Sequence, residues 1–504
     1  MNNEPTSTNP ALTLDLAEAL QDRRTKIVAT LGPACETREV LGEMIANGVD
    51  VVRLNFSHGS PEEHAERAQL VRELAAEHGR HIGIIGDLQG PKIRIERFAD
   101  ESVELEDGAE FILDAELGRD DGDAGRVGIT YKALPGDVEG GDVLLLDDGR
   151  LVLQVDRVEG SRIHTRVAVG GRLSNNKGIN RQGGGLSADV ITDKDRADIQ
   201  TAADIDVDYL AVSFPRHAED IEYARKLFEE AGGKGGIVAK IERAEALVAI
   251  ESILAVTDAI MIARGDLGVE IGDAELPPAQ KSLIRAARKA NVPVITATQM
   301  MESMISSPLP TRAEVFDVAN AVLDGTDAVM LSAETASGHY PAEAVQAMSR
   351  VCAGVDQHPS AQASDHRIDT RFERTDEAIA MATMYVANHL DVRAIASLTE
   401  SGSTPLWMSR ISSGIPIYAL TRHEHTSRRV SLYRGVYAVN YPIVQVQAVE
   451  ANRKAIEVLL DYGAVEQGDR VIIIKGDLMG VHGGTNSLKI IEVGSENEIP
   501  LPTE

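Results

Sequence analysis

The stretch GIVAKIE (Gly236–Glu242), with AIMIARGDLGVE (Ala259–Glu270) after it, decides how this chain folds. Each segment contains an almost continuous apolar run, the pattern of a strand that is buried on both faces of a parallel sheet. Charged residues end or follow each run, so Lys240, Glu242 and Asp266 are expected at one edge of the sheet, where parallel strands end. Ordinary salt bridges at strand ends are the alternative interpretation of these three residues.

Two carboxylates beside a glycine-containing turn suit a hard divalent cation that carries phosphate. Mg²⁺ is usually held by one or two carboxylates, and substrate oxygens and water fill its other positions. The ammonium of Lys240 offsets part of the negative charge. The sequence therefore predicts that Glu242 and Asp266 hold a metal ion at a phosphate-handling site.

A repeated alternation of strand-like and helix-like segments surrounds this stretch. Strand-like runs are expected at residues 26–31, 49–56, 82–87, 207–214, 237–242, 259–263, 292–298 and 328–332. Eight such units predict an α/β protein built on a (β/α)8 TIM barrel, in which functional residues lie at the C-terminal ends of the strands. The polar residues at these strand ends are Arg53, Asn55, Ser57, His58, Asp87, Lys240, Glu242, Arg264, Asp266, Thr298, Gln299, Glu302, Ser332 and Glu334.

One insertion interrupts the alternation between the third and fourth strands. Residues 93–187 alternate polar and apolar residues and contain Asp-Gly turns, which predicts a small antiparallel β-barrel. Because it leaves the barrel at the expected catalytic edge, we expect it to act as a lid. Lys177 near its end, before the glycine-rich residues 183–185, is expected to reach an anion, and a solvated loop lysine is the alternative.

A second α/β domain follows a polar linker near residue 357. Residues 369–504 are expected to form an open α/β domain, while residues 23–92 and 188–356 form the barrel and residues 1–22 an N-terminal segment with a short amphipathic helix. The first strand of the C-terminal domain runs into hydroxyl groups and a glycine at a helix start, which can hold phosphate or form an ordinary capped turn. These effector-site candidates are Thr399, Ser401, Gly402, Ser403 and Thr404.

The composition narrows the classes of partner and compartment. The 504 residues carry a formal charge of -29, which argues against nucleic acid and anionic membranes as partners. The two cysteines, Cys35 and Cys352, form no metal-type spacing and fit a reducing compartment. Without a membrane-spanning run or a secretion pattern, the chain is expected to be cytoplasmic.

Six motifs in this order resemble the pyruvate kinase family over nearly the whole chain. They are RLNFSHG (53–59), GDLQGPKIR (86–94), AKIE (239–242), ARGDLGVE (263–270), ATQMMESM (297–304) and MLSAET (330–335). The resemblance implies phosphoryl transfer from phosphoenolpyruvate to ADP, which gives pyruvate and ATP. It also implies a homotetramer and a phosphorylated activator, AMP or a sugar phosphate.

The resemblance assigns roles to the candidate residues. Glu242 and Asp266 match ligands of Mg²⁺, for which Mn²⁺ is an alternative, and Lys240 matches the lysine that stabilises the transferred phosphoryl group. The backbone N–H groups of Gly265 and Asp266 match the substrate-carboxylate site, and Thr298 matches a residue that delivers a proton through water. The residues that match groups gripping the nucleotide and phosphoryl are Arg53, Asn55, His58, Arg94 and Lys177.

Two departures from the family change what is expected. Many members bind K⁺ at positions that match Asn55, Ser57 and Asp87, with a threonine and a glutamate where this chain has Leu88 and Lys92. The residues of this expected monovalent-cation region are therefore Asn55, Ser57, Asp87 and Lys92. We expect the Lys92 ammonium to replace K⁺, as in the potassium-independent branch; the alternative is that Lys92 only neutralises Asp87 and K⁺ still binds. Ser403 stands where related enzymes often have arginine, which leaves the activator undefined.

Two other functions are weighed against this one. A Mg²⁺-dependent carbon–carbon lyase would use Glu242 and Asp266 but would not need the lid, Lys177 or the Arg53 motif. A catalytically silent sensor of nucleotides or sugar phosphates would gain nothing from keeping Lys240 and Thr298. The sequence leaves cooperativity, nucleotide preference and the effector open.

Overall fold

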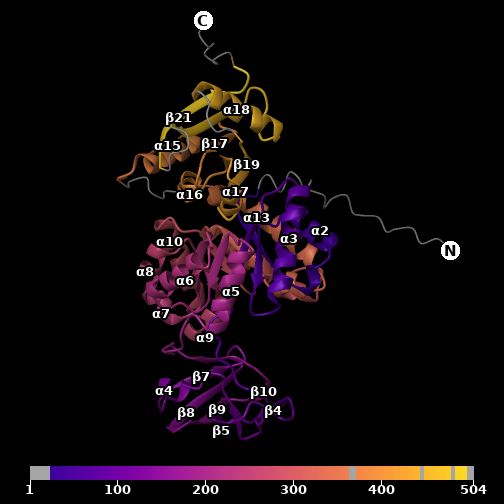
Figure 1. Ribbon diagram of the computed structural model, residues 1–504, viewed down its shortest axis with the longest axis vertical. Coiled ribbons are helices and arrows are strands. Elements are labelled where there is room, and N and C mark those ends of the chain that lie inside the picture. The colour runs from indigo at the N-terminus through magenta and orange to yellow at the C-terminus, as the bar shows by residue number, and fades with distance from the viewer. Residues whose placement is uncertain (1–22, 363–370, 443–447, 478–482, 496–504) are drawn as a thin grey trace, which may run out of the picture. The chain divides into compact units, whose positions relative to one another are not determined.

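A computed structural model describes residues 23–362, 371–442, 448–477 and 483–495 (Figure 1). The helix expected within residues 1–22 and part of the expected linker lie outside the described residues. The chain divides into two compact units, one with residues 23–53, 66–84 and the described part of 300–504, and one with residues 54–65 and 85–299.

Eight strands form a closed barrel in the order β1-β16-β15-β14-β13-β12-β3-β2, which confirms the predicted TIM barrel. The strands are β1 (Lys26–Leu31), β2 (Val51–Asn55), β3 (Gly83–Asp87), β12 (Tyr209–Val212), β13 (Gly236–Ile241), β14 (Ala259–Ala263), β15 (Val294–Ala297) and β16 (Ala328–Leu331). The pairs β1–β16, β3–β12, β12–β13, β13–β14 and β14–β15 are parallel, with Lys240 beside Met261. All residues of β1, β3 and β13 are buried, as their apolar runs predict.

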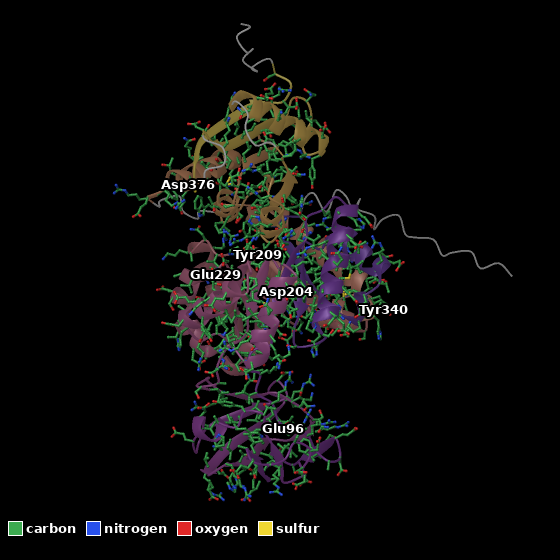
Figure 2. The ribbon with its side chains drawn as sticks, in the orientation of Figure 1. Glu96, Asp204, Tyr209, Glu229, Tyr340 and Asp376 are labelled. Atoms are coloured by element: carbon green, nitrogen blue, oxygen red, sulfur yellow. The ribbon has the colours of Figure 1, made fainter. Side chains whose placement is uncertain are left out.

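Helices follow the barrel strands, and threonine residues cap the N-termini of two of them. Thr192 and Thr311 cap α5 and α11 through capping boxes, which satisfy free N–H groups at the helix starts. Tyr209 at the start of β12 is fully buried (Figure 2). The helices are α2 (Arg38–Ala46), α3 (Pro61–Glu77), α5 (Asp193–Asp204), α6 (Ala218–Glu230), α7 (Ala244–Val248), α8 (Ile250–Val256), α9 (Arg264–Ile271), α10 (Leu276–Lys289), α11 (Arg312–Asp324), α12 (Ala333–Ala336) and α13 (Pro341–Asp356), with the 3-10 turns η1 (Pro33–Cys35) and η2 (Glu302–Ile305).

The insertion consists of β-strands and one short helix, and it has its own hydrophobic core. A six-stranded sheet has the order β11-β7-β8-β9-β5-β6, and β10 pairs with β4 in a second sheet. The six-stranded sheet is mixed rather than purely antiparallel as predicted, because β5 and β6 pair in parallel. Phe111 and Leu153 lie in the core of this insertion. Its elements are β4 (Ser102–Leu105), β5 (Glu110–Asp114), β6 (Arg126–Gly128), α4 (Leu134–Asp137), β7 (Val143–Leu146), β8 (Leu151–Glu159), β9 (Arg162–Val169), β10 (Gly171–Ser174) and β11 (Ile179–Arg181).

The C-terminal residues form the open α/β sheet that was predicted. Its order is β19-β18-β17-β20-β21, with parallel pairs except for the antiparallel edge strand β21. None of the helices that the structure describes is long and apolar enough to cross a membrane. The elements are α14 (Pro359–Gln362), α15 (Thr375–His389), β17 (Ala394–Leu398), α16 (Ser403–Ser409), β18 (Ile417–Thr421), α17 (Glu424–Val430), β19 (Val436–Asn440), α18 (Ala448–Asp461), β20 (Arg470–Gly476) and β21 (Thr485–Glu492).

Four ion pairs lie in the first unit: two connect barrel residues to C-terminal residues, and two lie within the start of the barrel. We call these pairs the junction cluster. Arg410 pairs with Asp327 through two guanidinium nitrogens, and Arg434 Nη2 lies 2.7 Å from Asp356 Oδ1. At the start of the barrel, Arg23 Nη1 lies 2.8 Å from Asp50 Oδ2, and Arg80 Nη2 lies 3.1 Å from Asp50 Oδ1. The pairs of the cluster are Arg410–Asp327, Arg434–Asp356, Arg23–Asp50 and Arg80–Asp50.

Candidate active site

The C-terminal ends of β13 and β3 bring three charged side chains together. Lys240 Nζ lies 3.0 Å from Glu242 Oε1 and 3.3 Å from Asp87 Oδ1. All three side chains are buried, and Asp87 is completely so. A single ammonium therefore lies against two carboxylates, in the place where the sequence predicted the catalytic edge of the barrel.

The end of β12 supports this cluster with groups that sequence reasoning missed. Lys240 Nζ donates to Ser213 Oγ at 2.6 Å, and Ser213 Oγ donates to the Leu88 carbonyl at 2.7 Å. The Phe214 N–H donates to Glu242 Oε2 at 2.8 Å, from a backbone with φ of 57°. The available signal was a hydroxyl residue at the end of a predicted strand, but its partners come from other strands.

The second metal candidate, Asp266, lies in the first turn of α9. Lys92 Nζ is 3.3 Å from Asp266 Oδ1, and both side chains are partly exposed. The sequence had placed Lys92 in the region of Asp87, whereas the structure places Lys92 beside Asp266 and Lys240 beside Asp87. The Lys240 ammonium is therefore a charge that neutralises Asp87.

The electrostatics of Glu242 fit a cation at this site. Burial raises the pKa of its carboxyl, Lys240 opposes the rise, and the charges of Asp266 and Asp87 add to it. Three carboxylates face two lysines here, so one additional positive charge or more would relieve the surplus. In the part of the chain that the structure describes, no group of three or more His, Cys, Asp or Glu side chains has metal-site spacing. An ion held by Glu242 and Asp266 would therefore draw its other ligands from substrate and water oxygens.

The turn after β15 positions Thr298. Thr298 has φ of 65°, a left-handed conformation that is unusual for a β-branched residue. Arg264, which was expected at the end of the sixth strand, donates from Nη2 to the Thr298 carbonyl at 2.7 Å. The Thr298 hydroxyl accepts from the Gly265 N–H at 2.9 Å and donates to the Ala297 carbonyl at 2.7 Å. The Gly265 amide expected to bind a substrate carboxylate is thus engaged with Thr298, and such binding requires this contact to rearrange.

The loop after β2 carries the expected phosphate-gripping residues. Arg53 Nη1 donates to Thr30 Oγ1 at 3.2 Å within the first unit. In the second unit, the Ser57 N–H donates to Asn55 Oδ1 at 3.2 Å, so the Asn55 side chain stabilises the turn. The His58 carbonyl contacts His64 Nε2 at 2.9 Å, and the His58 side chain is exposed.

Two cationic side chains of the insertion were expected to grip the nucleotide, Arg94 and Lys177. Both contact other groups of the insertion. Lys177 Nζ lies 2.6 Å from Asp147 Oδ1, and Arg94 Nη1 donates to the Asn176 carbonyl at 2.9 Å. Lys177 is thus ion-paired here, with its side chain 35% exposed. For Lys177 to reach a ligand anion, it has to leave Asp147.

The expected effector loop is an ordered turn. The Gly402 N–H donates to Thr399 Oγ1 at 2.9 Å, and the Ser401 and Ser403 hydroxyls are 2.9 Å apart. Thr404 Oγ1 lies 2.9 Å from Thr485 Oγ1, which joins the loop to β21. Gly402 has φ of 82°, and a Cβ there would lie 2.6 Å from Val430 Cγ1. Glycine is required at this position for both reasons.

Fold and site together define a class of protein: a multidomain TIM-barrel phosphotransferase with an inserted β structure and a C-terminal α/β domain. Residues 22–345 match the family described as "Pyruvate kinase, barrel domain", and residues 377–491 match "Pyruvate kinase, alpha/beta domain". The chain belongs to the pyruvate kinase family, as its motifs predicted.

Individual relatives are similar to this chain over almost its full length. "Pyruvate kinase II" of Salmonella typhimurium is 58% identical over 475 residues, which cover 94% of this chain and 99% of that protein. "Pyruvate kinase" of Haemophilus influenzae is 55% identical over 459 residues, covering 90% and 96%. "Pyruvate kinase 2" of Synechocystis is 42% identical and extends beyond the match, which covers 79% of its length.

Proposed function

We propose that this chain transfers the phosphoryl group of phosphoenolpyruvate to ADP with a divalent cation, Mg²⁺ or Mn²⁺, held by Glu242 and Asp266. The observation that carries the metal assignment is the surplus of carboxylates around Lys240 at the buried barrel edge. When bound, the divalent cation supplies positive charge to the phosphoryl and enolate oxygens.

Lys240 is the residue proposed to stabilise the transferred phosphoryl group. Its ammonium is fixed by Ser213, Glu242 and Asp87 before substrate arrives, so little reorganisation is needed during the reaction. A loose phosphoryl-transfer transition state depends mainly on such positioning and charge. Arg53 is proposed to add a second positive charge.

Thr298 and Gly265 are proposed to handle the pyruvate half of the substrate. The N–H groups of Gly265 and Asp266 lie at the start of α9, where the helix dipole favours a carboxylate. When the carboxylate takes the Gly265 N–H, the Thr298 oxygen loses that donor, and its O–H group can pass a proton through water to the enolate carbon once it leaves the Ala297 carbonyl.

The insertion is proposed to act as a lid. We propose domain bounds of 23–92 with 188–356 for the barrel, 93–187 for the lid and 369–504 for the regulatory domain. Arg94 and Lys177 from the lid, with Asn55 and His58 from the barrel, would grip the nucleotide. Lid closure would exclude water, which otherwise accepts the phosphoryl group.

Independence from K⁺ is proposed from Lys92. A fixed ammonium 3.3 Å from Asp266 supports this role, because it already supplies a monovalent charge beside a proposed metal ligand. Leu88, at the position of the family's threonine ligand, is 1% exposed and offers no side-chain oxygen.

The test is pyruvate formation from phosphoenolpyruvate and ADP with Mg²⁺ in buffer free of K⁺ and Na⁺, repeated with KCl. We expect similar rates in both buffers. The matched variant Leu88→Thr/Lys92→Glu should need KCl, because it loses the ammonium and regains oxygen ligands. A wild-type rate that appears only with KCl contradicts the role of Lys92, and no rate with any activator contradicts the kinase assignment.

Regulation and assembly are also proposed. The loop Thr399–Thr404 is a candidate site for AMP or a sugar phosphate, and its hydroxyls and the backbone at the start of α16 support that choice. A homotetramer is supported by apolar side chains left on the surface near α11, where Phe316 is 70% and Leu309 67% exposed. Phe316→Lys should shift the molar mass measured by light scattering toward smaller species. The cytoplasmic location remains a prediction.

A further inference from the structure

The turn after β15 has a backbone conformation that neighbouring groups must hold in place. Thr298 and Gln299 follow one another with φ of 65° and 55°, so two successive non-glycine residues are left-handed. Few non-glycine residues adopt this conformation, and β-branched ones such as threonine do so least readily. Because such a turn persists only where the surrounding structure fixes it, its supports set the position of the Thr298 hydroxyl.

Arg264 supplies this support from the neighbouring strand. The register of β14 and β15 pairs Ala263 with Ala297, so Arg264 and Thr298 are the next residues along adjacent strands. Arg264 donates to the Thr298 carbonyl from Nη2 at 2.7 Å and from Nε at 3.2 Å, and the residue is only 7% exposed. Hydrogen bonds from a charged donor are stronger than those between neutral groups, and two of them to one oxygen fix its direction.

The guanidinium group is also held at its far end. Its Nη1 atom lies 3.5 Å from Oε1 of Gln280, a buried residue of α10. The support therefore extends from α10 through Arg264 to the turn, within the second unit. A guanidinium stays protonated in proteins, so Arg264 keeps these hydrogen bonds throughout the pH range of an enzyme assay and does not itself give a proton to the substrate.

The buried carbonyl of Ala297 connects Arg264 to the Thr298 hydroxyl. It accepts from the Thr298 hydroxyl at 2.7 Å and from Arg264 Nε at 3.3 Å. When the hydroxyl turns away to pass on a proton, this oxygen loses one donor, and the loss is costly for a buried acceptor without a replacement. The Nε–H group, which is shared between the two carbonyls, can then turn to Ala297 while Nη2 keeps the Thr298 carbonyl.

We propose that Arg264 is a positioning residue for the protonation of the enolate. It fixes the turn that carries Thr298, and it replaces the hydroxyl as donor to the Ala297 carbonyl when the proton moves. In this step a water gives a proton to the enolate carbon, and the C–H bond forms from the electrons of the carbon–carbon double bond. The Thr298 hydroxyl gives a proton to that water and is restored by solvent. The inference rests on the proton-delivery role proposed for Thr298.

Two measurements separate the proton step from phosphoryl transfer. The first is kcat for pyruvate formation from phosphoenolpyruvate, ADP and Mg²⁺, in ordinary water and in heavy water. The second is the exchange of the pyruvate methyl hydrogens with heavy water in the presence of Mg²⁺ and ATP, followed by NMR. The exchange is the protonation run in reverse, so it requires no net phosphoryl transfer.

Arg264→Lys keeps the positive charge but loses the fork of donors and the shared Nε–H group. We expect kcat to fall about tenfold and the ratio of kcat in ordinary water to kcat in heavy water to rise about twofold, because a less well placed hydroxyl slows proton delivery. Methyl exchange should fall at least as much as kcat, and the KM for phosphoenolpyruvate should change by less than about twofold. Arg264→Met retains no donor and should lower kcat about 100-fold.

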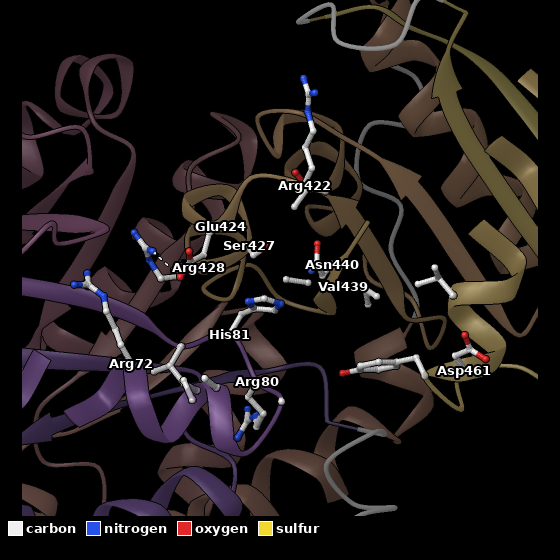
Figure 3. A pocket seen from close by; sticks show the side chains of 18 residues that line it. Arg72, Arg80, His81, Arg422, Glu424, Ser427, Arg428, Val439, Asn440 and Asp461 are labelled. Atoms are coloured by element: carbon white, nitrogen blue, oxygen red, sulfur yellow. Dashed lines mark ion pairs between the residues drawn. The ribbon is translucent and has the colours of Figure 1, made fainter. Parts of the chain in front are cut away.

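A second background and a control distinguish positioning from a general structural role. In the Thr298→Ala background, Arg264→Lys should cause no further change in the isotope ratio, because it acts through Thr298. Arg428 provides the control, since it is 8% exposed, lines the pocket in Figure 3 and pairs with Glu424 of its own helix at 3.4 Å. Arg428→Lys should leave the isotope ratio and the methyl exchange per turnover unchanged.

Two results would overturn the proposal. In the first, Arg264→Lys is folded by circular dichroism and loses activity, yet keeps the wild-type isotope ratio and methyl exchange per turnover, which indicates a structural role. In the second, it raises the isotope ratio as much in the Thr298→Ala background as in the wild type, which shows that it does not act through Thr298.

The Thr298→Ala variant separates this inference from the role proposed for Thr298. If Thr298→Ala changes both measurements and Arg264→Lys changes neither, only the role of Arg264 fails. If Thr298→Ala itself leaves both at their wild-type values, the proposed role of Thr298 fails, and this inference fails with it.

Discussion

The barrel edge and the junction cluster both bury charged side chains, but they balance the charges differently. In the junction cluster each carboxylate has a guanidinium partner, and Asp50 has two, Arg23 and Arg80. At the barrel edge one ammonium, that of Lys240, is shared by Glu242 and Asp87. The first arrangement is satisfied within the chain, and the second has negative charge left over.

The pKa shifts of two buried carboxyls express this difference. Burial favours the neutral form of Asp50, yet Arg23, Lys26 and Arg80 outweigh it and hold the pKa below its usual value. Burial raises the pKa of Glu242, and Lys240 does not outweigh burial and the neighbouring carboxylates. Equal burial with opposite shifts distinguishes a structural ion pair from a site prepared for a cation.

Removal of the shared ammonium should have the largest effect on activity. Lys240→Met should lower kcat on the order of 10³-fold, because the transferred phosphoryl group loses its fixed positive charge. Steady-state pyruvate formation measures this, and circular dichroism checks that the variant is folded. A folded variant with less than about a tenfold loss would show that Lys240 is structural, as the junction arginines are.

Removal of a junction charge should instead affect stability. Arg410→Met leaves Asp327 buried beside an apolar side chain and should lower the free energy of unfolding by about 3 kcal/mol. The midpoint of urea denaturation measures the change, and kcat per folded molecule should remain within twofold. The double variant Arg410→Met/Asp327→Leu should recover most of the loss, since no unpaired charge remains. An unshifted midpoint with lost activity would contradict the distinction.

Substitution of Ser213 tests how strongly the position of the Lys240 ammonium depends on an uncharged hydrogen-bond partner. Ser213→Ala removes the oxygen 2.6 Å from Lys240 Nζ, so the ammonium is less well positioned and kcat should fall about tenfold. The KM for phosphoenolpyruvate should change less than kcat, which a general loss of structure would not produce. Ser213→Thr keeps the hydroxyl and should restore most of the rate. Equal losses in both variants would indicate a packing role.

The carboxyl group of Glu270, at the end of α9, extends the comparison to the pH dependence of stability. Burial raises its pKa to about 7, although the Ala244 N–H and Arg243 oppose the rise. A raised pKa means that the folded state binds the proton more tightly, so stability is fully present below about pH 4.5 and falls as the pH rises toward about 7. Glutamine does not ionise, so in Glu270→Gln the loss of unfolding free energy between these two pH values should be smaller by on the order of 1 kcal/mol. Denaturation midpoints at pH 5 and pH 8 measure this, and an unchanged difference between them would contradict it.

Local sequence patterns predicted the barrel and its main functional residues for a physical reason. A buried parallel strand is a short apolar run, and the residue that ends the run lies at the strand's end, so Lys240, Glu242 and Asp266 could be placed together without their partners being known. The same logic placed Asp87 and Thr298. The motifs then named the family, because six long segments in one order specify it.

The contacts across strands could not be predicted. Ser213 lies 27 residues from Lys240, and Arg264 lies 34 residues from Thr298, so their hydrogen bonds exist only once the barrel has closed. The contact of Lys92 Nζ with Asp266, 174 residues away, likewise depends on the folded barrel.

The sequence by itself thus determined the eight strands, the inserted β structure, the C-terminal α/β domain and the charged residues at the catalytic edge, because these depend on local hydrophobic periodicity. Only the tertiary structure decided which ammonium neutralises which carboxylate, that Lys177 is held by Asp147, and that Arg264 holds the Thr298 carbonyl. Those outcomes depend on distances between residues that are far apart in the chain, and side-chain periodicity carries no information about them.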